Sequence, residues 1–165
     1  MKDEELLLRV LNSAPVTGGV VVDELDDARG VELVRRLGGS GSTREMEQLR
    51  RVRAALHAVV RGSTADGRHE LAAILGSAVR IPRITPLGVQ WELQAPTDDQ
   101  LGVRTVLAWS AVIEQFPGRL RACANEACNL FLIDHSRPGM AKWCSMASCG
   151  NRMKARAHAD RARLS

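Results

Sequence analysis

Apolar positions in the first two thirds of the chain recur mostly at helical spacing. The clearest stripe lies between Ser42 and about Arg61, where apolar residues follow one another three or four positions apart. Ser42 and Glu45 have the spacing of a capping box, which predicts the start of that helix. Asp23 and Asp98 are placed to cap two further helices. The pattern predicts additional helices over residues 2–12, 23–37, 69–79 and 99–116.

Residues 81–96 show an alternating pattern instead. Val89, Trp91 and Leu93 alternate with polar residues, which is typical of a half-buried strand. We therefore expect a small β-hairpin that pairs residues 80–85 with residues 88–95. Trp91 is expected to pack into the core of the domain. Upstream, the three valines at positions 20–22 predict one extended piece.

The pair Pro117-Gly118 ends the last of these helices and marks the expected domain boundary. Residues 1–118 then form a helical domain with a small β-hairpin, and residues 119–165 form a second, smaller domain. The second domain is expected to hold a short apolar strand over residues 130–133 and a helix from Cys149 to about Leu164. Because the link is so short, we expect the small domain to pack against the helix of residues 99–116. The predicted fold class is α+β, mostly α.

Charge is distributed unevenly over these two parts. The 165-residue chain has a net charge of +4. Residues 119–165 carry nine Lys and Arg against three acids, a net of +6, whereas residues 1–118 carry fourteen against sixteen, a net of −2. This asymmetry favours a basic module that meets a polyanion, although a merely solvated basic helix has the same composition.

The opening residues, MKDEELLLRV, lack the basic segment and the long apolar run of a secretory signal. No stretch approaches the roughly 20 apolar residues of a membrane-spanning helix. The expectation is a cytoplasmic protein that does not enter a membrane.

All four cysteines lie between residues 123 and 149, as two pairs with four residues inside each pair and fifteen between the pairs. This layout suits a tetrahedral Zn²⁺ site with two ligands from each of two turns. Two disulfides or a redox pair are the rival interpretation, and four unrelated buried cysteines are the remaining one. Reduced cytosolic thiols favour the metal. The predicted zinc ligands are Cys123, Cys128, Cys144 and Cys149.

The residues around the cysteines resemble the CGNR zinc finger family. The resemblance rests on Cys123-Ala-Asn-Glu-Ala-Cys128, Phe131, Asp134, Ser136, Lys142-Trp143-Cys144-Ser145-Met146 and Cys149-Gly150-Asn151-Arg152, in that order. It extends over about residues 119–163. In that family a domain called ABATE, associated with stress-induced transcription regulation, precedes the finger. Leu11-Asn12 and Asp23-Glu24-Leu25 fit the outline of that domain.

A knuckle that supplies two ligands, followed by two ligands at the start of a helix, resembles a treble-clef finger. Four thiolates would close the coordination sphere and leave no position for a substrate water, so zinc catalysis is not expected. The histidines His135 and His158 rank below the cysteines as ligands. The chain also lacks a nucleophile elbow, a phosphate-binding loop and an HExxH motif, and we expect no enzymatic activity.

The helix after Cys149 is the expected nucleic-acid contact. Its basic residues are Arg152, Lys154, Arg156, Arg161 and Arg163. Asn151 is equally suited to read a base edge or to hold the turn before the helix. The leading hypothesis is a transcription regulator that binds DNA through this helix, as the family resemblance implies. The alternative is a protein-interaction module with a purely structural zinc, and a homodimer is compatible with either.

Overall fold

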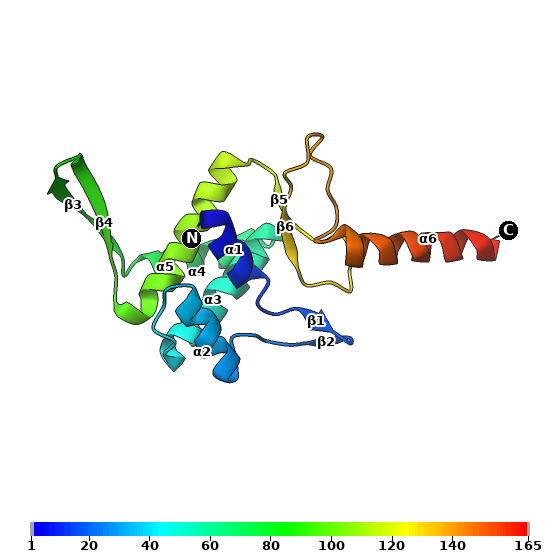
Figure 1. Ribbon diagram of the computed structural model, residues 1–165, viewed down its shortest axis with the longest axis horizontal. Helices are drawn as coiled ribbons and strands as arrows, with labels where there is room; N and C mark the ends of the chain where they lie inside the picture. Colours follow the sequence, from blue (N-terminus) through cyan, green and yellow to red (C-terminus); the bar gives the residue numbers. More distant parts are fainter. Residues whose placement is uncertain (1, 165) are drawn as a thin grey trace.

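The computed structural model describes residues 2–164, apart from the side chains of Asp27, Thr64 and Leu164. A cluster of helices forms its centre, with two hairpin arms and one long terminal helix extending from it (Figure 1). Helix α3 is the central element, since α1, α2, α4 and α5 all contact it directly or through the shared core. The helices are α1 (Asp3–Leu11), α2 (Asp27–Arg36), α3 (Thr43–Val60), α4 (Thr64–Leu75) and α5 (Thr97–Gln115).

Helix α3 begins as its sequence predicts. The Ser42 hydroxyl accepts a hydrogen bond from the Glu45 N–H at 3.0 Å, which confirms the cap. The buried Glu45 carboxylate accepts from the backbone N–H groups of Ser40 and Gly41 at 2.6 and 2.9 Å. These two hydrogen bonds close the loop before α3 onto the start of the helix.

The expected starts of three other helices shift, and the helix expected over residues 69–79 is α4, which begins at Thr64 and ends at Leu75. Helix α2 begins at Asp27 rather than after Asp23. Asp23 instead accepts from the Leu25 N–H at 2.9 Å and pairs with the guanidinium of Arg53, which rises from α3. Helix α5 begins at Thr97, and Asp98 accepts from the Ser42 hydroxyl at 2.5 Å. Both aspartates therefore join helices to each other, a role that depends on contacts distant in sequence.

The β-hairpins lie at the edges of the helical cluster. The strands β3 (Val79–Thr85) and β4 (Gly88–Gln94) confirm the predicted hairpin to within one residue at each end. The expectation for Trp91 was wrong, because its side chain is 63% exposed on an arm that projects away from the helices. The extended piece at residues 20–22 is one side of a second hairpin, β1 (Val16–Thr17) with β2 (Val20–Val21).

The C-terminal part consists of β5 (Leu120–Ala122), β6 (Phe131–Ile133), the π-helical turn η1 (Met146–Gly150) and α6 (Asn151–Leu164). The paired strands β5 and β6 dock on the helical cluster, and α6 extends away from it as the longest projection in Figure 1.

The docking site differs from the expected one. Strand β6 lies against the end of α1 and β5 lies against α3, while the end of α5 contributes Phe116, whose ring contacts His135 at 5.0 Å. Phe131 and Ile133 are buried in the same core as the helices. Among the described residues, no helix has both the length and the apolar character needed to cross a membrane.

Candidate metal centre

The four cysteine sulfurs converge beside the start of α6. All four Sγ atoms lie within 4.8 Å of one another. The Sγ atoms of Cys128 and Cys144 are 3.7 Å apart, and so are those of Cys144 and Cys149. Tetrahedral zinc with Zn–S bonds of about 2.3 Å requires sulfurs about 3.8 Å apart. A disulfide requires about 2.0 Å, so the arrangement fits a metal and not a bridge.

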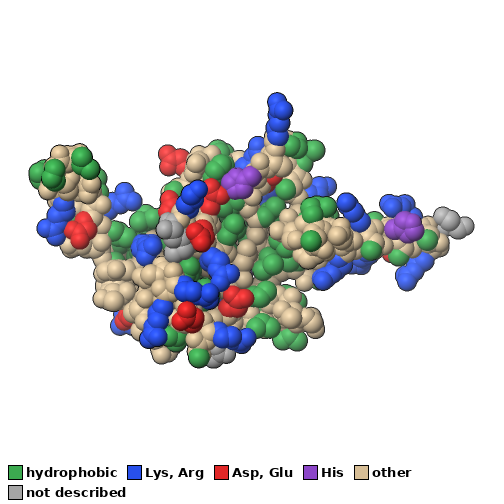
Figure 2. Space-filling view, viewed as in Figure 1, with side chains coloured by type: hydrophobic (Ala, Val, Ile, Leu, Met, Phe, Trp, Pro, Cys, Tyr) green, Lys and Arg blue, Asp and Glu red, His purple; other side chains and the backbone are tan. Residues whose placement is uncertain are grey.

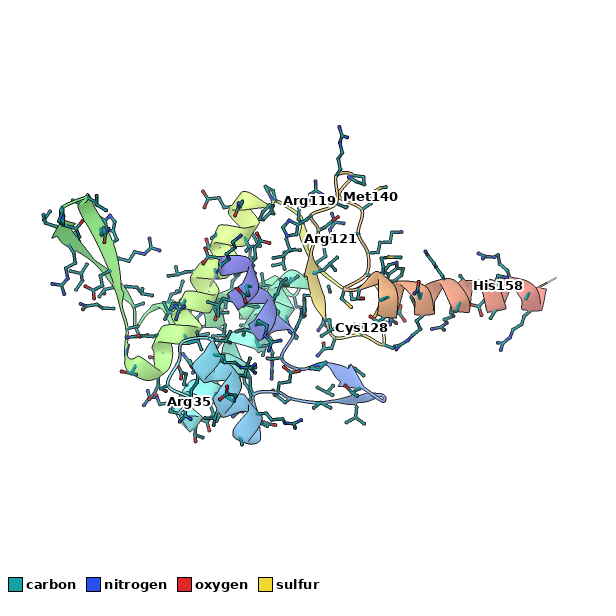
Figure 3. All side chains as sticks on the ribbon, in the orientation of Figure 1. Arg35, Arg119, Arg121, Cys128, Met140 and His158 are labelled. Atoms are coloured by element: carbon teal, nitrogen blue, oxygen red, sulfur yellow. The ribbon has the colours of Figure 1, made fainter. Side chains whose placement is uncertain are left out.

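Two turns position the first pair of sulfurs. Cys123 follows β5, and its N–H donates to the Leu130 carbonyl at 2.8 Å, which continues the β5–β6 pairing into the knuckle. The Cys128 N–H donates to the Asn125 carbonyl at 2.8 Å and closes the turn between the two ligands. Figure 3 shows Cys128 beside the first turn of α6.

The second pair is held by the turn that leads into α6. The Ser145 hydroxyl accepts from the Ser148 N–H at 3.4 Å, and the Gly150 N–H donates to the Ser145 carbonyl at 3.0 Å. A Cβ at Gly150 would lie 2.8 Å from the Met146 sulfur and 3.2 Å from the Trp143 ring. Glycine at this position therefore allows both side chains to close over the turn that carries Cys149.

Asn125 is a neighbour of the cysteine cluster that the sequence pattern did not predict. Its side chain is buried, and its Nδ2 donates to the Sγ of Cys149 at 3.4 Å. Its Oδ1 accepts from the Ala127 N–H at 3.2 Å, which fixes the amide in place. Its position two residues after Cys123, inside the knuckle, is the signal that could have identified it, since Asn commonly bonds the backbone two residues on.

The surroundings shift the pKa values of three of the thiols in different directions. The hydrogen bond from Asn125 lowers the pKa of Cys149 to about 7. Burial raises the pKa of Cys144 far above the usual thiol range and also raises that of Cys128. A bound divalent cation would stabilise all four as thiolates, which is the form that zinc requires.

Asp134 organises the loop between the two cysteine pairs. Its buried carboxylate accepts from the Ser136 N–H and hydroxyl at 2.9 and 2.6 Å and from the Ala141 N–H at 2.9 Å. The hydrogen bonds from Ser136 lower the pKa of Asp134 below its usual value. The guanidinium groups of Arg119 and Arg121 lie 3.8 Å from the same carboxylate, on the side of the finger where Figure 3 labels them.

The predicted nucleic-acid residues lie apart from the metal. Arg152, Lys154, Arg156, Arg161 and Arg163 are all exposed on α6. Arg152 also lines an open cleft between the β1–β2 hairpin and the knuckle, together with Arg61 from the end of α3. The Asn151 side chain is exposed and donates to the Ala147 carbonyl at 3.4 Å, one turn back in η1.

Residues 119–162 match the family model described as CGNR zinc finger. No curated protein shows a significant match to the chain. The matched segment contains all four cysteines, together with the knuckle, the Asp134 loop and most of α6. The C-terminal part of this protein therefore matches the CGNR zinc finger model and holds a cluster of four thiols suited to zinc.

Proposed function

We propose that this protein is a zinc-dependent, DNA-binding transcription regulator whose C-terminal helix enters the major groove. The observation that carries the proposal is the position of α6. The helix starts two residues after the ligand Cys149 and projects from the body with its side chains exposed (Figure 1). A helix held at one end by a metal site can be inserted into a groove without disturbing the core behind it.

The basic side chains of α6 lie on two opposite sides of the helix. At about 3.6 residues per turn, Arg152, Arg156 and Arg163 share one side. Lys154 and Arg161 fall on the opposite side. Figure 2 shows Lys and Arg side chains both above and below the projecting helix. Phosphates line both walls of a major groove, so cations on two sides of one helix suit both backbones at once.

The side between the two basic groups carries mostly short side chains. Asn151, Ala155, His158 and Ala162 form this stripe, and Ala159 borders it, so His158 is its one large side chain. Small side chains let the helix backbone approach the floor of the groove, where Asn pairs well with an adenine edge. The remaining side carries Asp160, the only acid of the helix, and would face away from the DNA.

In this proposal the zinc ion has a structural role. When bound, it would link the knuckle to the start of α6 in a treble-clef-like arrangement and stabilise the folded finger. Four thiolates leave no open coordination position, so the proposal includes no reaction at the metal. The N-terminal helices, with their weak resemblance to ABATE, would receive the regulatory signal.

The test is selection of bound sequences from a random DNA library by the zinc-loaded full chain at two salt concentrations. Affinity should fall with salt by about 0.9 log units per log unit of salt for each phosphate contacted. Replacing Arg152, Arg156 and Arg163 with Ala should reduce that slope by about 3 and leave one zinc per chain.

The matched control removes three exposed arginines from the helical cluster instead, Arg9, Arg36 and Arg44, and should keep the slope of the unmodified chain. Salt-independent binding or no binding by zinc-loaded protein would contradict the proposal. The basic helix would then be assigned to an acidic protein partner, which is the alternative function.

A further inference from the structure

The β3–β4 hairpin forms an arm with an uncovered apolar face. It projects from the helical cluster at the end of the molecule opposite α6 (Figure 1). Only its base is anchored, where Leu93 and Ala95 pack against the core. An isolated two-stranded hairpin has marginal stability in water unless one face is covered. The arm therefore lacks a packing partner within the described part of its own chain.

The strand register sorts the arm into two unlike faces. The cross-strand pairs Pro82 with Trp91 and Ile84 with Val89 lie on one face. Ile84 is 85% exposed, Trp91 63% and Val89 56%, and Leu87 at the tip is 91% exposed. Figure 2 shows these apolar side chains gathered at the end of the arm.

The opposite face is polar toward the tip of the arm, and Val79 and Ile81 lie on it nearer the base. Arg83 pairs with Gln90 in the register and makes an ion pair with Glu92 at 2.7 Å. Such a face is already suited to water. Toward the tip of the arm the apolar side chains therefore share one face, which Arg80 borders at the base.

We propose that this apolar face, formed by Pro82, Ile84, Val89 and Trp91 with Leu87 at the tip, packs against the same face of a second copy of the chain. Together the exposed side chains present on the order of 600 Å², at the upper end for apolar patches on monomers. A symmetric contact buries the patch of both copies, on the order of 1,200 Å², which reaches the range of specific interfaces.

The geometry favours contact between faces over extension of the sheet along β3. Proline has no N–H, so Pro82 removes one donor from the outer edge of that strand. In the register, Pro82 and Trp91 form a pair without mutual hydrogen bonds, whose side chains lie close together. The result is a continuous apolar surface toward the tip of the arm.

A dimer formed this way carries its two fingers at its far ends. Because α6 lies opposite the arm, the contact covers none of the zinc finger (Figure 1). Dimerisation therefore does not depend on DNA binding, and the two proposals fail independently of each other.

The test is sedimentation equilibrium of the zinc-loaded full chain, without nucleic acid, over a wide range of protein concentrations. The unmodified chain should dimerise, and the double variant Ile84→Ser, Trp91→Ser should dimerise at least about 100-fold more weakly. The matched control, Ile81→Ser with Gln90→Ser, changes the polar face and should dimerise like the unmodified chain. All three should have the same zinc content and helical circular dichroism.

Tryptophan fluorescence tests the location of the contact separately. Emission should shift to shorter wavelength as protein concentration rises, and Trp91→Phe should abolish the shift while the chain still dimerises. A monomer at every concentration would overturn the proposal and assign the face to a different protein. A dimer that the Ile84→Ser, Trp91→Ser variant leaves unchanged would overturn it as well.

Discussion

Asn125 shows how one side chain can adjust the thiol of a candidate metal ligand. Its amide donates to the Cys149 sulfur while its oxygen is held by the Ala127 N–H. The donated hydrogen bond stabilises the thiolate form, which is the form that binds zinc. The residue thus links the folded shape of the knuckle to the electronic state of a ligand in the second cysteine pair.

Replacing Asn125 with Ala should lower zinc affinity by about 10- to 100-fold, because the Cys149 thiolate loses its donor. Competition with a chromophoric chelator measures the change. Asn151→Ala is the matched control, since the Asn151 amide is exposed and bonds only η1 among the contacts described. Equal zinc affinity for the Asn125→Ala and unmodified proteins would show that the hydrogen bond is without effect on the site.

His57 is a second residue whose role depends on the folded structure. Its Nε2–H donates to the Leu11 carbonyl at 2.8 Å, and its ring lies 4.4 Å from that of Phe131. Burial lowers the pKa of His57 to about 4, from an ordinary value of 6.5. The imidazole therefore stays neutral in the folded protein over most of the acid range.

Protonation of His57 should make the protein less stable in acid. Between pH 6.5 and 4 the unfolded chain binds this proton and the folded chain does not, so stability is full above pH 6.5 and falls as the pH drops. The free energy of unfolding should decrease by about 1–2 kcal/mol between pH 7 and 5 from this group.

Urea unfolding of the unmodified chain and His57→Gln at each pH checks the effect. The cysteines protonate in both chains, so the difference between the two curves isolates His57. Parallel curves for the two proteins would refute the assignment.

At the scale of elements, the strand β6 joins the finger to the helical cluster. The side chain of Asn12, just after α1, accepts from the Phe131 N–H at 2.7 Å and donates to the Phe131 carbonyl at 3.1 Å. Asn129 donates to the Ala14 carbonyl at 3.1 Å, and the Arg61 guanidinium lies 4.9 Å from the centre of the Phe131 ring. The docking is therefore a set of directed contacts around one buried aromatic residue.

Asn12→Ala should lower the free energy of unfolding by about 2–4 kcal/mol, since it leaves two backbone groups of Phe131 without partners next to the core. Asn12→Asp keeps the acceptor and loses the donor, so its free energy of unfolding should lie between those of the Asn12→Ala and unmodified proteins. Denaturant unfolding measures both. If the Ala and unmodified proteins were equally stable, the pair of hydrogen bonds would not hold the finger in place.

At the scale of the whole molecule, the finger and the helices share one core. Phe131 and Ile133 pack with the helical residues, while the four cysteines lie outside that core. Zinc should therefore stabilise the finger directly and the helical cluster indirectly.

Cys144→Ser should remove zinc, unfold the knuckle and α6, and leave the N-terminal helices folded with a lower melting temperature. Circular dichroism and zinc content measured on the same sample test this. Ser148→Ala, an exposed neighbour, is the control and should retain one zinc per chain. Unchanged zinc content in the Cys144→Ser protein would exclude Cys144 as a ligand.

Local patterns were sufficient for several features of this fold. The cap at Ser42, the helix α3, the register of the β3–β4 hairpin and the set of four cysteines all follow from residues close together in sequence. Capping, strand alternation and ligand spacing are short-range effects, so a single sequence contains them in full.

Other features depended on long-range contacts. The local sequence predicts Asp23 as a helix cap, but in the folded protein Asp23 forms an ion pair with Arg53 instead. The alternation at Val89 and Trp91 predicts an apolar face on the hairpin. Whether that face is buried depends on whether a distant segment packs against it.

The sequence by itself determined which segments are helical, the β3–β4 hairpin and the set of four cysteines of this protein. Only the tertiary structure decided that Asn125 supports Cys149, that the finger docks on α1 through Asn12, and that α6 and the β3–β4 arm extend in opposite directions (Figure 1). The physical reason is that periodicity sets which side of an element is apolar, while the packing of distant segments sets what that side meets.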